Sequence, residues 1–162
     1  MAHSRSPIQL NQTAFLGKAA QDLVHLSSAQ VIDIYRQRGL IIPVEVSSTL
    51  LYLQQHAQSV LTDVSDALDI PHQLAAQRIE KLIRLGLLEK QRDPNDGRRV
   101  LLKLTRTGLR EAAILDQCME DVAVVYQQLF DEIDCDLAAK LNQAIERLNT
   151  RSLLARFEAL FP

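Results

Sequence analysis

The sequence lacks the features that would place the protein in a membrane or in a disulfide-bonded secreted class. No run of about 18 uninterrupted apolar residues is present, and the first residues lack the apolar core of a signal peptide. Only two cysteines occur, Cys118 and Cys135, both in helical stretches, so we expect reduced thiols rather than a disulfide. We therefore expect a cytoplasmic protein that does not enter a membrane.

Aromatic residues and recognisable chemical motifs are also scarce. There is no tryptophan, and the apolar share of 47% comes mainly from aliphatic residues in long stretches rich in Leu, Ala, Gln, Glu and Arg, which favours helices. No glycine-rich phosphate loop, nucleophile motif or pair of catalytic carboxylates is present, so we do not expect an enzyme. His25, His56 and His72 lack metal-ligand spacing, and we expect neither a metal nor a cofactor.

Charge is distributed unevenly along the chain, although the net charge is only −2. The segment 71–107 carries nine basic and four acidic residues, a net charge of +5, whereas the segment 108–136 carries one basic and eight acidic residues, a net charge of −7. A polyanion would be attracted to the first segment and repelled by the second, which would orient the protein on it.

The order of the patterns predicts four regions. We expect a mobile arm at residues 1–10 and a dimerisation helix over 11–38, with a possible break near Ser27-Ser28 and an end at Gly39. A DNA-binding lobe should span 44–105, and further dimerisation helices should span 106–162.

The middle of the lobe has the pattern of a helix-turn-helix. A helix is predicted over 44–56, and a short one over 62–68 with Thr62 as N-cap; Pro71 then opens a basic amphipathic helix. The inner face of that helix should comprise Ala75, Ile79, Leu82 and Ile83. Its outer face should comprise Gln73, Ala76, Gln77 and Glu80.

Two short strands should follow and form a wing. The stretches 87–92 and 98–104 flank the turn 93–97, whose sequence Asp-Pro-Asn-Asp-Gly is typical of a hairpin. Thr105 should cap a helix over 105–133, and one last helix is predicted over 136–161, capped by Asp134 or Asp136. These helices offer more apolar surface than one small domain can bury, so we expect a dimer interface.

The wing resembles that of the MarR family of bacterial transcriptional regulators. The family pattern is Asp-x-Arg at the wing tip followed by an apolar strand that ends in Leu-Thr-x-x-Gly, matched here by Asp96, Arg98, Leu104, Thr105 and Gly108. The resemblance covers residues 39–110 well and the flanking helices only by pattern. It implies a mainly α fold, with a winged helix-turn-helix lobe and a two-stranded β wing between long N- and C-terminal helices that form a dimerisation domain.

The resemblance also implies a function. It predicts a homodimer that binds double-stranded DNA at a pseudo-palindromic operator as a repressor, with release caused by a small aromatic or lipophilic effector. In such wings the arginine at position 98 enters the minor groove and Asp96 holds it in place, since a narrow minor groove attracts arginine. Gln77 stands where many members have a basic residue, and glutamine can pair with adenine. The family's oxidant-sensing type relies on a cysteine in the N-terminal helix, which this chain lacks.

From these observations we predict two sets of site residues. An effector pocket could be lined by His25, Tyr35, Tyr52 and His56, although core or surface positions explain these residues better. The residues expected to contact DNA are Thr62, Ser65, His72, Gln73, Ala76, Gln77, Lys81, Asp96, Arg98 and Arg99.

The alternative function is a winged-helix module that binds a protein partner without reading DNA, and the basic charge of the lobe counts against it.

Overall fold

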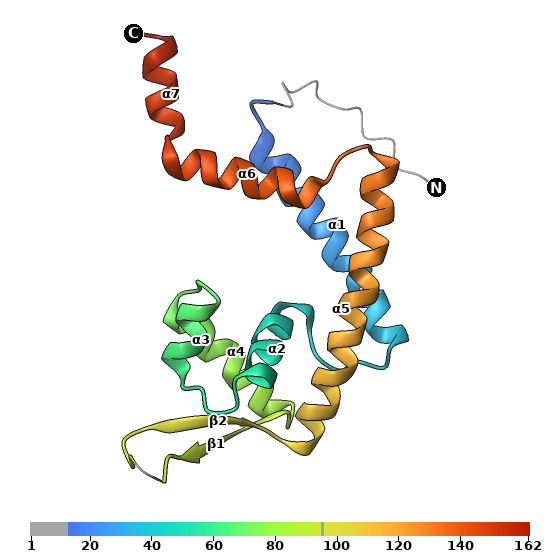
Figure 1. The fold of residues 1–162 in the computed structure, drawn as a ribbon, viewed down its shortest axis with the longest axis vertical. Helices are drawn as coiled ribbons and strands as arrows, with labels where there is room; N and C mark the ends of the chain where they lie inside the picture. Colours follow the sequence, from blue (N-terminus) through green and yellow to red (C-terminus); the bar gives the residue numbers. More distant parts are fainter. Residues whose placement is uncertain (1–12, 95) are drawn as a thin grey trace. The chain divides into compact units, whose positions relative to one another are not determined.

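A computed structural model describes residues 13–94 and 96–162, which form helices and one β hairpin (Figure 1). The predicted fold class, mainly α with a two-stranded wing among long helices, is confirmed. The arm expected at residues 1–10 lies outside the described residues.

The chain forms two compact units, one ending at Cys118 and the other running from Met119 to Pro162. The elements are α1 (Leu16–Gln37), the 3₁₀ helix η1 (Val44–Val46), α2 (Ser47–Gln55), α3 (Leu61–Ala67), α4 (His72–Arg84), β1 (Leu88–Arg92), β2 (Val100–Leu104), α5 (Arg106–Glu132), α6 (Leu137–Thr150) and α7 (Leu153–Leu160).

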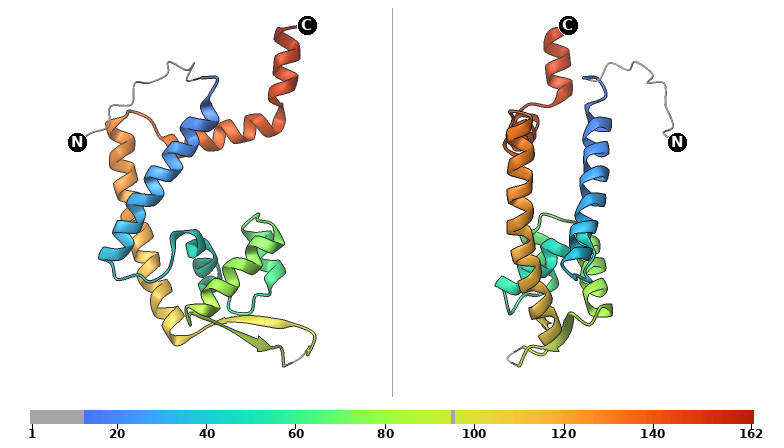
Figure 2. Two further views of the ribbon diagram at one scale, coloured as in Figure 1. Left: turned by 180° about the vertical axis from the view of Figure 1, so that it is seen from behind. Right: turned by 90° about the vertical axis from the view of Figure 1, so that its right-hand side faces the viewer.

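A small core holds α2, α3, α4 and the hairpin together. Figures 1 and 2 show these three helices gathered on one side of the hairpin. The hairpin is antiparallel, with Leu88 opposite Leu104 and Lys90 opposite Leu102. The N–H of Leu102 also donates to the carbonyl of Ser59 at 2.8 Å, which ties the chain before α3 to the outer edge of β2. The fully buried side chains of this core include Val46, Leu50, Val64, Ala75, Leu82 and Leu87.

The N-terminal helix and the first half of α5 complete this unit. α1 is a single helix, without the break considered near Ser27-Ser28, and it ends where Gly39 adopts a φ of +69°. The carboxylate of Glu111, on α5, is buried and accepts hydrogen bonds from the N–H groups of Ile41 and Ile42 at 2.6 and 3.0 Å. The loop after α1 is therefore fixed to α5 by one acidic side chain.

The C-terminal unit differs from the sequence prediction in one respect. A single helix over 136–161 was expected, but the chain forms α6 and α7 with a break at Arg151 and Ser152. The hydroxyl of Ser152 accepts a hydrogen bond from the N–H of Ala155 and starts a new helix, while Arg156 donates to the carbonyls of Arg147 and Arg151. Asp136 caps α6 as predicted, because its carboxylate accepts from the N–H of Ala139.

Candidate nucleic-acid interface

The turn between α3 and α4 sets the direction of the second helix. Asp69 adopts a left-handed conformation with a φ of 47°, and the hydroxyl of Ser65 donates to the carbonyl of Ile70 at 2.8 Å. Pro71 is the N-cap of α4, and its carbonyl accepts from the N–H groups of Leu74 and Ala75. Ser65, expected to contact DNA, thus has its hydroxyl engaged in shaping this turn.

The start of α3 corrects one prediction. Thr62 is not the N-cap; it is an exposed residue in the first turn of the helix, which begins at Leu61. The carboxylate of Asp63 reaches back to accept a hydrogen bond from the N–H of Val60 at 2.8 Å. An acidic side chain does this well, because it also meets the positive end of the helix.

The two faces of α4 are divided largely as the sequence predicts. Ala75, Ile79 and Leu82 are buried, whereas His72, Gln73, Gln77 and Glu80 are exposed. Ala76 is half-buried and lines a hollow of about 270 Å³ between α4 and the wing, so its methyl group is less open than expected. The outer face of α4 therefore presents mainly two glutamines and a glutamate.

Two basic residues of the lobe are held by carboxylates of the same chain. Lys81 of α4 forms an ion pair with Glu45 of η1, and Lys90 of β1 forms one with Glu80 of α4. The hydrogen bond from Lys81 is the main cause that lowers the pKa of the Glu45 carboxyl. Lys81, which the sequence placed among the DNA contacts, is thus held at the side of α4 by a neighbouring element.

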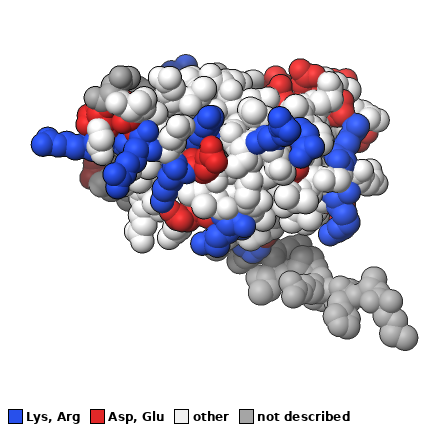
Figure 3. Space-filling view, turned by 90° about the horizontal axis from the view of Figure 1, so that it is seen from below, with Lys and Arg blue, Asp and Glu red and all other residues white. Residues whose placement is uncertain are grey.

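The wing tip is open and basic. Asp96 accepts a hydrogen bond from the backbone N–H of Arg98 at 3.0 Å, so its carboxylate fixes the turn. Arg99 lies 3.6 Å from the carboxylate of Asp93, while Arg98 is exposed and takes part in no ion pair among residues 13–94 and 96–162. Figure 3 shows Lys and Arg residues across the wing side of the lobe, with Asp and Glu residues between them.

Comparison with known proteins assigns this lobe to a family. Residues 42–99 match the sequence model of the MarR family. The winged lobe is a MarR domain. The match covers most of the lobe and neither the N-terminal helix nor the helices after the wing. We call residues 44–104, from η1 to β2, the MarR lobe.

Solved structures show the same fold at low sequence identity. The PcaV transcriptional regulator of Streptomyces coelicolor is 23% identical with a TM-score of 0.64, over 90% of this chain and 99% of PcaV. A MarR transcriptional regulator from Methanosarcina mazei is 21% identical with a TM-score of 0.59, over 86% and 97%. MepR of S. aureus, solved with DNA, is 19% identical with a TM-score of 0.50, over 81% and 98%. No curated protein sequence matches the chain closely enough to count as a relative.

The junction after the MarR lobe explains the Leu-Thr-x-x-Gly pattern. The hydroxyl of Thr105 donates to the carbonyl of Gly86 at 2.7 Å and accepts from the N–H of Gly108 at 3.0 Å, so it caps α5 and ties it to the end of α4. A Cβ atom on Gly108 would lie 1.9 Å from the carbonyl oxygen of Leu87. Only glycine therefore lets α5 start this close to the lobe.

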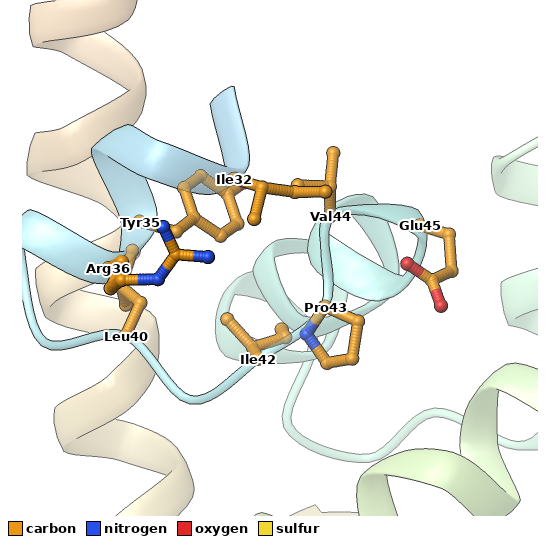
Figure 4. A pocket seen from close by; sticks show the side chains of 8 residues that line it. All are labelled: Ile32, Tyr35, Arg36, Leu40, Ile42, Pro43, Val44 and Glu45. Carbon is orange, nitrogen blue, oxygen red and sulfur yellow. The ribbon is translucent and has the colours of Figure 1, made fainter. Parts of the chain in front are cut away.

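The four residues expected to line an effector pocket do not lie together. Tyr35 lines a cavity of about 290 Å³ between the end of α1 and η1 (Figure 4). Its hydroxyl is 2.8 Å from that of Ser47, and burial raises its pKa, so it stays protonated. Tyr52 and His56 instead stack on each other at 4.3 Å at the end of α2, and His25 is exposed on α1. The other lining residues are Ile32, Arg36, Leu40, Ile42, Pro43, Val44 and Glu45.

The sequence analysis did not predict the residues that join elements far apart in the chain. Glu45 and Glu111 each join two such segments, and no local spacing reveals these pairs.

Among the described residues, no group of three or more His, Cys, Asp and Glu side chains could hold a metal ion. No helix in the described part of the chain is both long and apolar enough to cross a bilayer.

Proposed function

We propose that this chain is a cytoplasmic, homodimeric transcription regulator that binds a pseudo-palindromic operator, represses its genes, and releases the DNA when a small molecule binds. The observation that carries DNA binding is the exposed guanidinium of Arg98 at the wing tip, beside a helix whose outer face offers Gln73 and Gln77. Glutamine can form two hydrogen bonds to adenine in the major groove, and arginine is attracted to the negative potential of a narrow minor groove.

The shared fold supports this mode of binding. MepR has been solved in complex with DNA, and its structure resembles this chain over 81% of the chain's length. In helix-turn-helix proteins the second helix enters the major groove, and dimers span half-sites about 34 to 36 Å apart. We assign the same role to α4, with Asp96 and the backbone of the turn presenting Arg98 to the adjacent minor groove.

A dimer is supported by apolar side chains that the chain does not cover. α6 and α7 contain no buried residue, and the ring of Phe157 and the side chain of Leu160 are 59% and 72% exposed. Monomeric proteins rarely leave such patches open. We propose that a second copy of the chain covers them, which gives two lobes and hence two half-sites.

The cavity beside Tyr35 is our candidate for the effector site. Its wall is mostly aliphatic, and the buried hydroxyl of Tyr35 and the charged groups of Arg36 and Glu45 add polarity, which suits a small aromatic or lipophilic molecule (Figure 4). PcaV, which has the same fold, has been solved with its natural ligand. His25, Tyr52 and His56 lie elsewhere and are not part of this proposal.

The test is fluorescence anisotropy with labelled DNA from upstream of the chain's own gene and with random DNA of equal length. We expect tighter binding to the upstream DNA, and a steep loss of affinity with salt, of roughly 0.9 logarithmic units per phosphate contact for each tenfold rise in salt. Equal affinity for both DNAs together with a flat salt dependence would contradict the proposal.

Two substitutions assign the binding to the lobe. Arg98→Ala should weaken binding about tenfold or more and reduce the salt dependence by about one contact, whereas Gln77→Ala should relax preference at one base pair by about 1 to 3 kcal/mol. Lys18→Ala, which removes an exposed cation from α1, is the matched control and should change neither. If Lys18→Ala weakens binding as much as Arg98→Ala, the effect is one of overall charge and the assignment to the wing is wrong.

A further inference from the structure

Two adjacent residues of α4 are held by ion pairs to different elements. Glu80 pairs with Lys90 of β1, and Lys81 pairs with Glu45 of η1. Lys81 follows Gln77 by one helical turn, so its amine starts from the edge of the outer face that would meet DNA. In the structure this amine is turned to η1 instead of remaining free beside Gln77.

A second cation of α4 contacts the start of α2 through a hydrogen bond rather than an ion pair. Arg78 donates to the hydroxyl of Ser48 at 3.4 Å, and its charge also lowers the pKa of the Glu45 carboxyl. Glu45 and Ser48 thus engage two basic side chains that lie three residues apart on α4. Of the two, only the carboxylate of Glu45 offsets the positive charge that α4 itself can offer to phosphate.

We propose that Glu45 competes with DNA phosphate for Lys81 and so lowers the affinity of this protein for DNA. The inference rests on the proposed DNA-binding function and names the residue that limits it. When the lobe docks, the amine of Lys81 leaves Glu45 and contacts a phosphate oxygen, so one ion pair is exchanged for another. The exchange is feasible because the side chains of Lys81 and Glu45 are 37% and 59% exposed, and exposed ion pairs are weak.

The exchange predicts that removing the Glu45 carboxylate raises the affinity for DNA. Wild-type protein must break the Glu45–Lys81 pair before Lys81 can contribute, whereas a protein without the carboxylate offers Lys81 freely. Removing an acidic residue near DNA also relieves general repulsion, and that second effect requires a matched control. Glu89, an exposed acid on β1 that forms no ion pair among the described residues, provides it.

The experiment compares Glu45→Gln, Glu89→Gln, Lys81→Gln and the double variant Glu45→Gln/Lys81→Gln by DNA anisotropy over a series of salt concentrations. We expect Glu45→Gln to bind about two- to fivefold more tightly than Glu89→Gln, which corresponds to the strength of an exposed ion pair. The double variant should exceed Lys81→Gln only by the small factor that Glu89→Gln gains over the wild type, because without the lysine the Glu45 carboxylate has no amine to hold and only general repulsion is relieved. Circular dichroism should show the same fold for all four proteins.

Two outcomes would overturn the inference while leaving the proposed function in place. One is equal binding by Glu45→Gln and Glu89→Gln; the other is a gain from Glu45→Gln beyond that of Glu89→Gln that persists undiminished in the Lys81→Gln background. Flat, salt-independent binding by the wild type would instead overturn the proposed function and this inference together.

A measurement without DNA tests the ion pair itself. Acetylation of lysines by acetic anhydride, followed by mass spectrometry, should label Lys81 faster in Glu45→Gln than in the wild type, because the paired amine is held by the carboxylate. Lys103, an exposed lysine on β2, should be labelled at the same rate in both proteins. Equal labelling of Lys81 in both would overturn the inference.

Discussion

The MarR lobe and the segment α6–α7 carry similar amphipathic patterns but satisfy them differently. In the lobe, Leu50 and Leu82 are 0% exposed, because six short elements turn their apolar faces toward one another. In α6–α7, Leu148 is 41% and Phe157 is 59% exposed, and neither helix has a buried residue. An amphipathic pattern therefore predicts that one face of a helix will be buried. It does not predict whether the covering surface belongs to the same chain or to another molecule.

The difference also separates the two kinds of contact that a regulator of this fold needs. The lobe is stabilised by its own core and presents polar and basic groups outward, where DNA would meet them. The exposed leucines and phenylalanines of α6–α7 offer contacts of the kind that hold protein subunits together. Three predictions test this division, from the largest expected effect to the smallest.

The core of the lobe should tolerate truncation far less than α7 does. Leu82→Ala should lower the free energy of unfolding by about 2 to 5 kcal/mol, because a fully buried side chain leaves a cavity. Leu154→Ala on α7, where the side chain is 64% exposed, should cost clearly less. Urea unfolding followed by circular dichroism, at protein concentrations low enough to keep the chain monomeric, measures both, and equal losses would contradict the comparison.

Phe157→Ala should act on self-association rather than on the fold of the lobe. Burial of a phenylalanine contributes about 1.5 to 3 kcal/mol, so the dissociation constant of the proposed dimer should rise about tenfold or more. Glu158→Ala, at the next position on the same helix, is the control and should leave it nearly unchanged. Sedimentation velocity over a range of concentrations decides; a wild type that is monomeric throughout would contradict the dimer.

Thr105, the N-cap of α5, should contribute more to stability than Ser152, the N-cap of α7. Both hydroxyls cap a helix, a contribution of about 1 kcal/mol, but that of Thr105 also donates to the carbonyl of Gly86. Thr105→Ala should thus destabilise the protein by about 2 kcal/mol, and Ser152→Ala by about half of that or less. Thr105→Ser keeps the hydroxyl and should be close to wild type. Thermal unfolding checks the ranking, and a larger effect at Ser152 would reverse it.

Local patterns predicted the elements of the lobe well, and for identifiable reasons. The turn residues of the wing, the cap at Thr105 and the glycine ends of α1 and α4 are set by interactions within a few residues, which a sequence displays directly. The predictions were less accurate where two local signals competed. Thr62 and Asp63 both can cap a helix, and Ser152 interrupts a pattern that otherwise continues through α6 and α7.

The candidate site divides in the same way. Gln73, Gln77 and Arg98 were predicted to be outward-facing residues, and in the structure all three are exposed. The engagement of Lys81 by Glu45, the role of Ser65 in the turn, and the separation of Tyr35 from Tyr52 and His56 all depend on residues that meet only after folding. Sequence spacing carries no information about these tertiary contacts, because the partner residues lie on different elements.

By itself, the sequence determined most of the helices and both strands, which face of α4 is apolar, and that the segment 71–107 is basic, because these follow from short-range periodicity and residue type. Only the tertiary structure decided which basic residues of that segment form ion pairs. Arg98, at the wing tip, forms none with the described residues, whereas Lys81 is paired with a glutamate 36 positions away. The reason is physical: hydrophobic burial brings distant elements together without regard to their order, and charge pairing follows from that packing.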